Sequence, residues 1–457
     1  MDTKALRQKI LDLAIHGKLV PQDPNDEPAS VLLERIRVEK ERLIKEGKIK
    51  KGKKSAKTSD KPHYPYELPK GWVWTTLGDL FSLQAGKNIA AKEIYPEFSE
   101  IYKYPCFGGN GIRGFVSNFN RNGDFPIIGR QGALCGNVNL AIGDFYATEH
   151  AVVVERFSDT DLMWTYYVLI ALNLNQYATA TAQPGLAVNV INDVIVPVPP
   201  FQEQCRISKA VTRLFSLINE IEHGKQKLQG TIKQTKSKVL DLAVHGKLVP
   251  QDVNDEPANE LLKRINPKAE IITDNGHYQK LPEGWTICKL KDICSKLVDG
   301  DHNPPKGTKE TTEYLMLSAQ NIVNDNIVYT NGVRYLNHDT FETSDKRTKV
   351  MQGDLLITIV GTLGRSCVFS DNKKITLQRS VACLTPLIYN HFLKYYMDSS
   401  SIQKYMTTNA KGTAQKGFYL NQLEQLPIMI PPLTEQQRIV ARIEKIFARL
   451  DVIESAL

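Results

Sequence analysis

The chain has 457 residues, of which 42% are hydrophobic and 24% charged, and it carries a formal net charge of +8 at pH 7. This composition excludes a disordered or fibrous chain, and the length predicts roughly three domain-sized units. No run approaches the roughly 18 apolar residues of a membrane span, and the start of the chain lacks the apolar core of a signal peptide. We therefore expect a cytoplasmic protein.

The first segment, residues 1–47, contains a motif that returns later in the chain. ILDLAIHGKLVPQDPNDEPAS begins at Ile10 and recurs as VLDLAVHGKLVPQDVNDEPAN from Val239, at an offset of 229. A match of this length indicates an internal duplication. His16 and His245 hold the same place in both copies and could be paired catalytic histidines. Each ends an apolar helical run and precedes Gly-Lys, which favours a helix C-terminus with glycine in the left-handed cap.

A basic segment follows and accounts for most of the net charge. Residues 37–62 hold eleven Lys/Arg against four Asp/Glu, whereas the rest of the chain has 47 basic and 46 acidic residues. The Lys-, Gly- and Ser-rich residues 48–65 predict a disordered basic linker. Such a linker could hold phosphates without sequence preference, or it could simply be solvated.

Residues 66–200 form the first of two variable segments. It opens with LPKGW at Leu68 and closes with VPPFQEQCRI from Val198. Short β-rich stretches such as FPIIG and HAVVVER alternate with Gly- and Asn-containing turns, which predicts a compact module of mixed α/β topology with many loops.

A glycine motif in this segment matches a nucleotide-binding pattern. Gly109 to Gly114 reads GNGIRG, and GxGxxG cradles a dinucleotide only where it joins a strand to a helix. Here FVSNFN follows, which is a strand and turn signal. We therefore interpret the motif as a glycine-rich loop of this module, which carries Asn110 and Arg113.

The central region, residues 201–265, predicts a long helix from about Glu203 to Val244, roughly 60 Å in length. Its apolar residues follow alternating steps of four and three, with breaks at Lys225 and Thr235, and so form a heptad seam that needs a partner. The seam could pair with another helix of the chain or mediate homodimerisation. Its members are Ile207, Val211, Leu214, Ile218, Ile221, Leu228, Ile232, Val239 and Leu242.

A short linker, residues 266–277, leads to the second variable segment, residues 278–432. This segment opens with LPEGW at Leu281 and closes with IPPLTEQQRI from Ile430, and TAQKGFYLN within it matches TAQPGLAVN in the first segment. Shared ends with dissimilar middles suggest two modules that read different ligands. The run NPPK from Asn303 half-matches the Asn-Pro-Pro-aromatic motif of amino-methyltransferases, but its fourth residue is Lys, so a turn is the better interpretation.

The last segment, residues 433–457, continues the heptad pattern through Ile439, Ile443 and Ile446. Together with residues 1–47 it repeats, in two pieces, the helical region found whole at the centre. We therefore expect an α/β (α+β) fold in which a pair of long antiparallel helices separates the two modules. If the chain ends meet, the arrangement is circular with a pseudo-twofold axis.

Catalytic and metal-binding signatures are not evident in the sequence. The seven cysteines are scattered without a CxxC pair, which predicts free core thiols rather than disulfides or a zinc site. No Walker loop, HExxH or GxSxG motif occurs. We expect no catalytic residue, no metal and no cofactor in this chain.

The positive net charge allows a polyanionic partner such as DNA, and loops of both modules carry Arg, Lys, Asn, Gln and similar side chains, which can form paired contacts with base edges in the major groove. Each candidate could also be an ordinary solvated loop residue. The candidates in the first module, besides Asn110 and Arg113, are Lys87, Asn88, Arg130, Gln131 and Gln183. Those in the second module are His302, Gln320, Asn321, Arg365, Gln378, Arg379, Lys411 and Gln415.

The LPxGW openings, the PPxxEQxxI closings, the split helical repeat and HGKLVPQD resemble, over essentially the whole chain, the specificity subunit of type I restriction-modification enzymes. The resemblance implies two target-recognition domains on antiparallel helices, each reading half of a bipartite, asymmetric double-stranded DNA site. The Lys-rich residues 37–62 have no counterpart in the second copy, which leaves their role open.

The resemblance also implies partners. Two modification subunits would methylate adenine with S-adenosylmethionine, and restriction subunits would supply nuclease activity and translocation, which use ATP and Mg²⁺. Two other hypotheses compete with a non-catalytic DNA adaptor. A self-sufficient methyltransferase or nuclease would need a cofactor or metal motif, and a scaffold that binds proteins would show no sequence-specific DNA binding.

Overall fold

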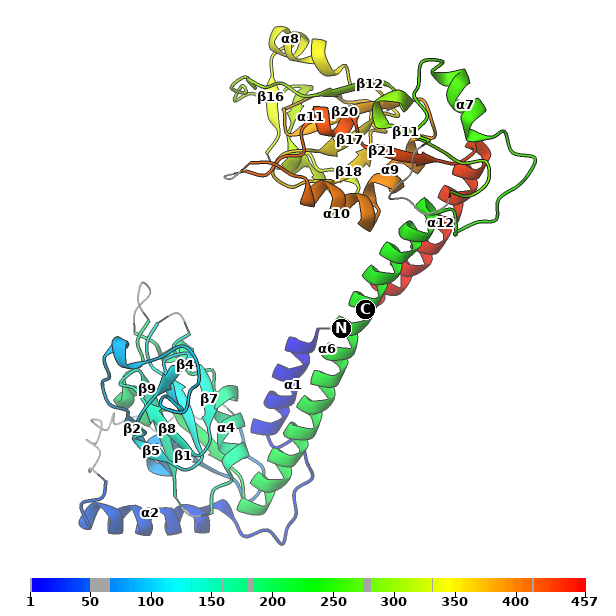
Figure 1. The fold of residues 1–457 in the computed structure, drawn as a ribbon. Coiled ribbons are helices and arrows are strands. Elements are labelled where there is room, and N and C mark those ends of the chain that lie inside the picture. The colour runs from blue at the N-terminus through cyan, green and yellow to red at the C-terminus, as the bar shows by residue number, and fades with distance from the viewer. Residues whose placement is uncertain are drawn as a thin grey trace. The chain divides into compact units, whose positions relative to one another are not determined.

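The computed structural model describes residues 2–49, 66–132, 134–157, 159–179, 184–273, 281–330, 332–412 and 415–457. The chain divides into two compact units, Met1–Gly224 and Lys225–Leu457, which we call unit 1 and unit 2 (Figure 1). Most of the predicted basic linker, and Gln183, lie outside the described residues. The division falls inside the predicted central helical region.

Unit 1 places its helices around short strands. Its helical segments are α1 (Thr3–Ile15), α2 (Ala29–Lys45), α3 (Leu77–Leu80), η1 (Ala91–Glu93), α4 (Leu162–Ala171), η2 (Leu174–Tyr177), α5 (Val188–Asn192) and the first part of α6 (Phe201–Val244). Its strands are β1 (Val73–Thr76), β2 (Phe81–Ala85), β3 (Tyr104–Gly108), β4 (Gly111–Val116), β5 (Arg121–Asn122), β6 (Phe125–Gly129), β7 (Val138–Ala141), β8 (Asp144–Ala147), β9 (Ala151–Arg156) and β10 (Ile195–Val198).

The strands of unit 1 form two four-stranded sheets and one pair. One sheet has the order β2-β9-β6-β7 and is antiparallel, and the other has the order β4-β3-β8-β5 with β3 and β8 parallel. β1 pairs with β10, which brings the start and end of the variable segment together. Strand β9 is central in its sheet, and its apolar run Ala151–Val154 is fully buried. A continuous apolar run is what a strand covered on both faces requires.

Unit 2 contains the remaining elements. Its helical segments are the second part of α6, α7 (Ala258–Ile265), η3 (Leu290–Ile293), η4 (Ala319–Asn321), α8 (His338–Thr348), α9 (Asn390–Asp398), α10 (Ser400–Thr408), α11 (Leu420–Glu424) and α12 (Leu433–Ser455). Its strands are β11 (Thr286–Lys289), β12 (Cys294–Asp299), β13 (Tyr314–Leu317), β14 (Ile322–Val323), β15 (Asn326–Ile327), β16 (Arg334–Leu336), β17 (Leu355–Thr358), β18 (Ser366–Val368), β19 (Lys374–Leu377), β20 (Val381–Pro386) and β21 (Pro427–Ile430).

The sheets of unit 2 repeat the topology of unit 1. The order β12-β20-β17-β18 matches β2-β9-β6-β7, and β16-β13-β19 matches β4-β3-β8, again with one parallel pair. The pair β11-β21 matches β1-β10, and the hairpin β14-β15 is additional. Two variable segments with little sequence in common therefore share one fold, and the predicted mixed α/β topology of both modules is confirmed.

Helix α6 is one continuous helix of 44 residues and ends at Val244 as predicted. In unit 1, α1 runs antiparallel to it, because Arg7 of α1 donates to Asn219 at 2.8 Å and to Glu222 at 3.0 Å near the end of that unit's part of α6. In unit 2, α12 runs antiparallel to the second part, and Lys236 Nζ lies 3.2 Å from Glu454 Oε2 near the far end of α12. The antiparallel pairing is thus confirmed within each unit, and the meeting of the two chain ends stays a prediction.

The predicted heptad seam is only partly buried. Ile207, Val211 and Ile218 are buried in unit 1, as are Ile232 and Val239 in unit 2. The middle of the seam departs from the prediction, because Ile221 is 48% exposed and Leu228 is 39% exposed. Heptad periodicity alone does not predict where along the helix its partner helix ends.

A buried junction joins each α/β domain to its helices and explains the repeated sequence landmarks. The indole Nε1 of Trp72 in LPKGW donates to Glu203 of PPFQEQ at 2.9 Å, and Gln22 donates to the same carboxylate at 3.3 Å. Burial raises the pKa of the Glu203 carboxyl, and these two hydrogen bonds oppose that shift. The LPKGW and PPFQEQ motifs therefore supply the two partners of one buried hydrogen bond.

The same junction recurs in unit 2 with closely similar geometry. Trp285 donates to Glu435 at 3.1 Å, and Gln251 donates to it at 3.1 Å. Arg438 pairs with Asp255 at 2.6 Å, and its counterpart in unit 1, Arg206 with Asp26, is formed at 2.5 Å. Removing one partner of a buried polar contact costs free energy, and both copies keep the same partners.

The repeated histidines have the structural role that the cap signal predicted. Nδ1 of His16 lies 2.6 Å from the carbonyl oxygen of Asp12, and Nδ1 of His245 lies 2.6 Å from that of Asp241. The glycine after each histidine has a φ near +64°, in the left-handed region that ends helices. All seven cysteines are free thiols, as predicted.

Candidate nucleic-acid interface

Four loops of unit 1 converge at one edge of its two large sheets. The backbone N–H of Gly86, after β2, donates to the carbonyl of Ala151 at 3.0 Å, and that of Thr148, after β8, donates to Phe107 on β3 at 2.9 Å. The N–H of Arg130, after β6, donates to His150 at 3.0 Å. We call residues 86–88, 108–113, 129–132 and 148–150 loop edge 1.

Glycines allow these loops to approach so closely. A Cβ on Gly86 would lie 2.1 Å from the carbonyl oxygen of Ala147, and one on Gly129 would lie 1.8 Å from that of Gly109. Both distances are far shorter than any van der Waals contact, and the obstructing atoms are backbone. The chain path of loop edge 1 therefore requires glycine at both positions.

Most candidates of the first module lie on loop edge 1. Lys87, Asn88, Asn110, Arg113 and Gln131 are exposed, and Arg130 is half-buried. Gly109 and Asn110 form the turn between β3 and β4, and the rest of the motif, with Arg113, lies in β4 rather than in a loop. This glycine motif therefore does not have the strand-to-helix context of a dinucleotide site. Gln183 is outside the described residues.

Unit 2 builds the same edge from different side chains. The N–H of Gly300, after β12, donates to Val381 at 3.1 Å, and that of Gln378, after β19, donates to Leu317 on β13 at 2.8 Å. The N–H of Ile359, after β17, donates to Ser380 at 2.9 Å. Loop edge 2 consists of residues 300–302, 318–320, 359–365, 378–380, 411–412 and 415–417.

Candidates of the second module also gather at loop edge 2. Gln378 is half-buried there, and Nε2 of His302 lies 2.7 Å from Asp299 Oδ2, within hydrogen-bond distance. Lys411 lies next to Val360 through the backbone bridges that both make with Gly417. The exposed candidates at this edge are His302, Gln320, Arg365, Arg379, Lys411 and Gln415.

Asn321 corrects the sequence-based prediction. Its side chain is fully buried, accepts from the N–H of Ser318 at 2.8 Å and donates to the carbonyl of Val328 at 3.0 Å. Both ends of the amide thus hold the turn after β13. Asn321 is a structural residue and cannot reach a base edge without dismantling that turn.

Two residues of loop edge 1 were missed by the sequence-based search. Glu149 and His150 form the turn between β8 and β9, at the positions that Arg379 and Ser380 hold in unit 2. Side-chain atoms of this region are buried without a hydrogen-bond partner: Arg130 Nε, Asn139 Nδ2, Glu149 Oε2 and His150 Nδ1. Buried polar atoms left unpaired in this way are costly and often mark a site that a ligand completes. No sequence signal singled out the ATEHAV stretch.

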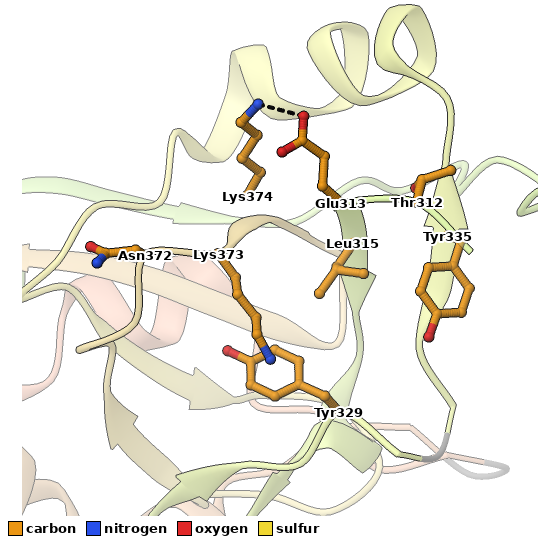
Figure 2. A pocket seen from close by; sticks show the side chains of 8 residues that line it. All are labelled: Thr312, Glu313, Leu315, Tyr329, Tyr335, Asn372, Lys373 and Lys374. Carbon is orange, nitrogen blue, oxygen red and sulfur yellow. Dashed lines mark hydrogen bonds and ion pairs between the residues drawn. The ribbon is translucent and has the colours of Figure 1, made fainter. Parts of the chain in front are cut away.

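A cavity of about 420 Å³ in unit 2 lies away from loop edge 2 (Figure 2). Tyr314 pairs with Lys374 at the starting ends of the parallel strands β13 and β19, whereas the loops of the edge follow their other ends. Lys374 is tied to Glu313 at 2.7 Å, and Lys373 Nζ lies 3.5 Å from the centre of the Tyr329 ring, as Figure 2 shows. These lysines are thus already engaged within the unit.

The described residues contain no cluster of three or more His, Cys, Asp or Glu side chains arranged to hold a metal ion. Among the same residues, no helix has the length and apolar character to cross a bilayer.

Comparison with known families places this architecture. The family described as the type I restriction modification DNA specificity domain matches residues 69–229 and 282–456. The chain belongs to this family. Each match in the specificity-domain family begins in an LPxGW motif and takes in one α/β domain with helical residues after it, so the family unit occurs twice in the chain.

Individual members of the specificity-domain family are similar over different lengths. The EcoEI specificity subunit of Escherichia coli is 26% identical and aligns with 99% of this chain and 90% of its own length. The EcoAI subunit of the same species is 30% identical over 64% of this chain and 62% of its own length. The EcoprrI subunit, also from Escherichia coli, is 47% identical over 32% of this chain and 36% of its own length.

A solved chain from work on "complex assembly and conformational transition of the type I R-M system" has a similar fold. Its TM-score is 0.60 at 17% identity, and the match covers 86% of this chain and 94% of the solved one. The fold expected for the specificity-domain family is thus confirmed by structure as well as by sequence.

Proposed function

We propose that this chain is a non-catalytic specificity subunit whose two α/β domains each read one half of a bipartite, asymmetric DNA site. The observation that carries the proposal is the repeated loop edge. The same strand order and the same backbone contacts present different side chains in units 1 and 2. A duplicated fold with dissimilar edge residues is suited to reading two different sequences.

The chemistry of the loop edges supports base recognition. Arg130, Gln131 and Arg113 in unit 1, with Arg379 and Gln320 in unit 2, offer the paired donors and acceptors that distinguish guanine and adenine in the major groove. Lys87 and Lys411 can hold phosphates and set the register. Part of each edge therefore specifies sequence and part supplies affinity.

Helix α6 supports a fixed separation between the half-sites. It is continuous across the boundary between the two units, and each part is braced by an antiparallel helix of its own unit. We infer that its length sets the non-specific spacer, much as the spacing within dimeric DNA readers sets the distance between half-sites.

Exposed apolar side chains on α6 support docking of partner subunits. Leu217 is 46% exposed, Ile221 48% and Leu228 39%. By contrast, the seam residues Ile207, Val211, Ile218, Ile232 and Val239 of the same helix are buried. Apolar surface of this kind is typical of protein interfaces. We infer that two modification subunits dock along the helices, with restriction subunits joining the complex in the cytoplasm. Those partners would use S-adenosylmethionine, ATP and Mg²⁺, and this chain would hold none of them.

The test is to map methylated adenines across the genome in cells that carry the partner subunits, with and without this chain. We expect methylation at a single two-part motif that disappears when the chain is removed. Methylation that persists without the chain, or methyl transfer by the purified chain alone, would contradict the proposal.

Replacing Arg130 with Ala should weaken recognition of one half-site by about 1–3 kcal/mol. The reason is the position of the guanidinium on loop edge 1, where its Nε is buried and unpaired. Competition binding of the full complex to DNA variants in each half-site measures the effect. Arg365→Ala on loop edge 2 is the matched control and should affect only the other half-site. An equal loss for every sequence would make Arg130 a phosphate contact.

A further inference from the structure

The turns that follow β8 and β19 have the same pattern of backbone hydrogen bonds. In unit 1 the N–H of Thr148 donates to Phe107 at 2.9 Å and that of Ala151 donates to Thr148 at 3.0 Å. In unit 2 the N–H of Gln378 donates to Leu317 at 2.8 Å and that of Val381 donates to Gln378 at 3.0 Å. The two four-residue turns therefore hold the same position on the two loop edges.

The second residue of each turn has opposite hydrogen-bonding character. It is Glu149 in unit 1 and Arg379 in unit 2. An ionised carboxylate only accepts hydrogen bonds, whereas a guanidinium only donates them. One position of a shared frame thus presents an acceptor in one unit and a donor in the other.

The contacts of Glu149 leave one of its oxygens free for a ligand. Oε1 lies 3.1 Å from Nε2 of His150, whereas Oε2 is buried and has no hydrogen-bond partner. The side chain as a whole is 36% exposed although Oε2 itself is buried, so a ligand at the edge meets the carboxylate and reaches Oε2 when the side chain rotates. Nδ1 of His150 and Nε of Arg130 are also buried and unpaired. A donor from outside the chain would satisfy the carboxylate.

We propose that Glu149 is a specificity-determining residue of unit 1 that accepts a hydrogen bond from the exocyclic N4 amino group of a cytosine in the major groove. Arg379 is its counterpart in unit 2 and donates to the O6 and N7 atoms of a guanine. The inference rests on the proposed function, because it names the chemical group that one position of each half-site must offer. His150 is a positioning residue that holds the carboxylate through Oε1.

The experiment uses the full chain with its modification subunits and a DNA library randomised in both half-sites. Methylated products are sequenced for the wild type and for Glu149→Gln, Glu149→Arg and Asp144→Asn. Asp144 is the matched control, because it begins β8 at the end opposite the turn and undergoes the same change from carboxylate to amide. The preference at the second half-site, measured in the same reaction, reports whether each variant complex is intact.

We expect Glu149→Gln to reduce discrimination at one position of the first half-site by roughly tenfold or more, with the second half-site unchanged. Glu149→Arg should move that position toward guanine, and Asp144→Asn should leave the profile as in the wild type. An unaltered first half-site in both Glu149 variants would overturn the inference while leaving the proposed function standing. A wild-type complex that selects no two-part site would instead overturn the proposed function.

Discussion

Inserting four residues into α6 between Gly224 and Lys225 is expected to lengthen the preferred DNA spacer by one or two base pairs and to leave both half-site sequences unchanged. Four helical residues add about 6 Å and rotate the second part of the helix by about 40° relative to the first. One step of B-DNA adds about 3.4 Å and a rotation of about 34°. The insertion point is the boundary between the units, so the contacts of α6 within each unit are kept.

Methylome sequencing of cells that carry the extended chain measures both the spacer and the half-sites. A four-residue insertion after Gly143, in the turn between β7 and β8, is the control, because this turn lies at the end of β8 opposite loop edge 1 and outside α6. The control should keep the original spacer. An unchanged spacer in the α6 variant, or altered half-sites with the original spacing, would show that α6 does not set the distance.

Asp354→Ala is expected to destabilise unit 2 by about 3–5 kcal/mol, the largest effect we predict for a single substitution. Asp354 is 1% exposed and accepts from Lys296 Nζ at 2.8 Å, Thr385 Oγ1 at 2.6 Å and the N–H of Met351 at 2.9 Å. Truncation leaves these donors facing an apolar cavity at the start of β17. Hydrogen exchange measured by mass spectrometry along a urea series should show the loss in unit 2 peptides.

Glu270→Ala is the control for that measurement. Glu270 pairs with Lys289 at 3.1 Å, but its side chain is 74% exposed, so its removal should leave the protection of unit 2 peptides close to that of the wild type. Equal protection of Asp354→Ala and wild type would mean that the buried pair adds no stability. Loss of protection in unit 1 to the same extent would mean that the two units do not unfold independently.

The helical half of the architecture could be predicted because its signals are local. Heptad spacing places α6 and α12, and the Gly after His16 and His245 marks two helix ends. The contact between Trp72 and Glu203 could not be predicted, because the two residues are 131 positions apart and nothing in either motif names the other. The exposed middle of the seam at Ile221 was likewise invisible to periodicity.

The sheet topology could not be predicted from the sequence, for a different reason. FPIIG of β6 and LLIT of β17 are both short apolar runs, and neither carries information about its neighbours or register. The two variable segments were expected to be mixed α/β modules, yet their common strand order emerged only from the structure. Tertiary packing, and not local propensity, selects among the possible pairings of such strands.

The candidate interface was partly predictable. The sequence correctly indicated glycine- and polar-rich loops at strand ends. Arg130 and Arg379 belong to these loops and lie on the loop edges. The prediction that Asn321 reads DNA was wrong, because a loop asparagine can also form hydrogen bonds with the backbone of its own turn. Glu149 was missed because the sequence-based prediction favoured donors, and its equivalence to Arg379 follows from the backbone hydrogen bonds of the two turns.

Gly86 and Gly300 hold equivalent positions where two main chains approach closely, and they have a consequence for how such proteins diversify. A Cβ at Gly300 would lie 2.2 Å from the carbonyl oxygen of Leu377, much as one at Gly86 would strike Ala147. The main chain cannot move at either position, so the conformation of the loops is fixed. A new target sequence can therefore arise without remodelling of the loops. One codon change at a turn position can alter the base preferred at one position of a half-site, while the preferences at the other positions are kept.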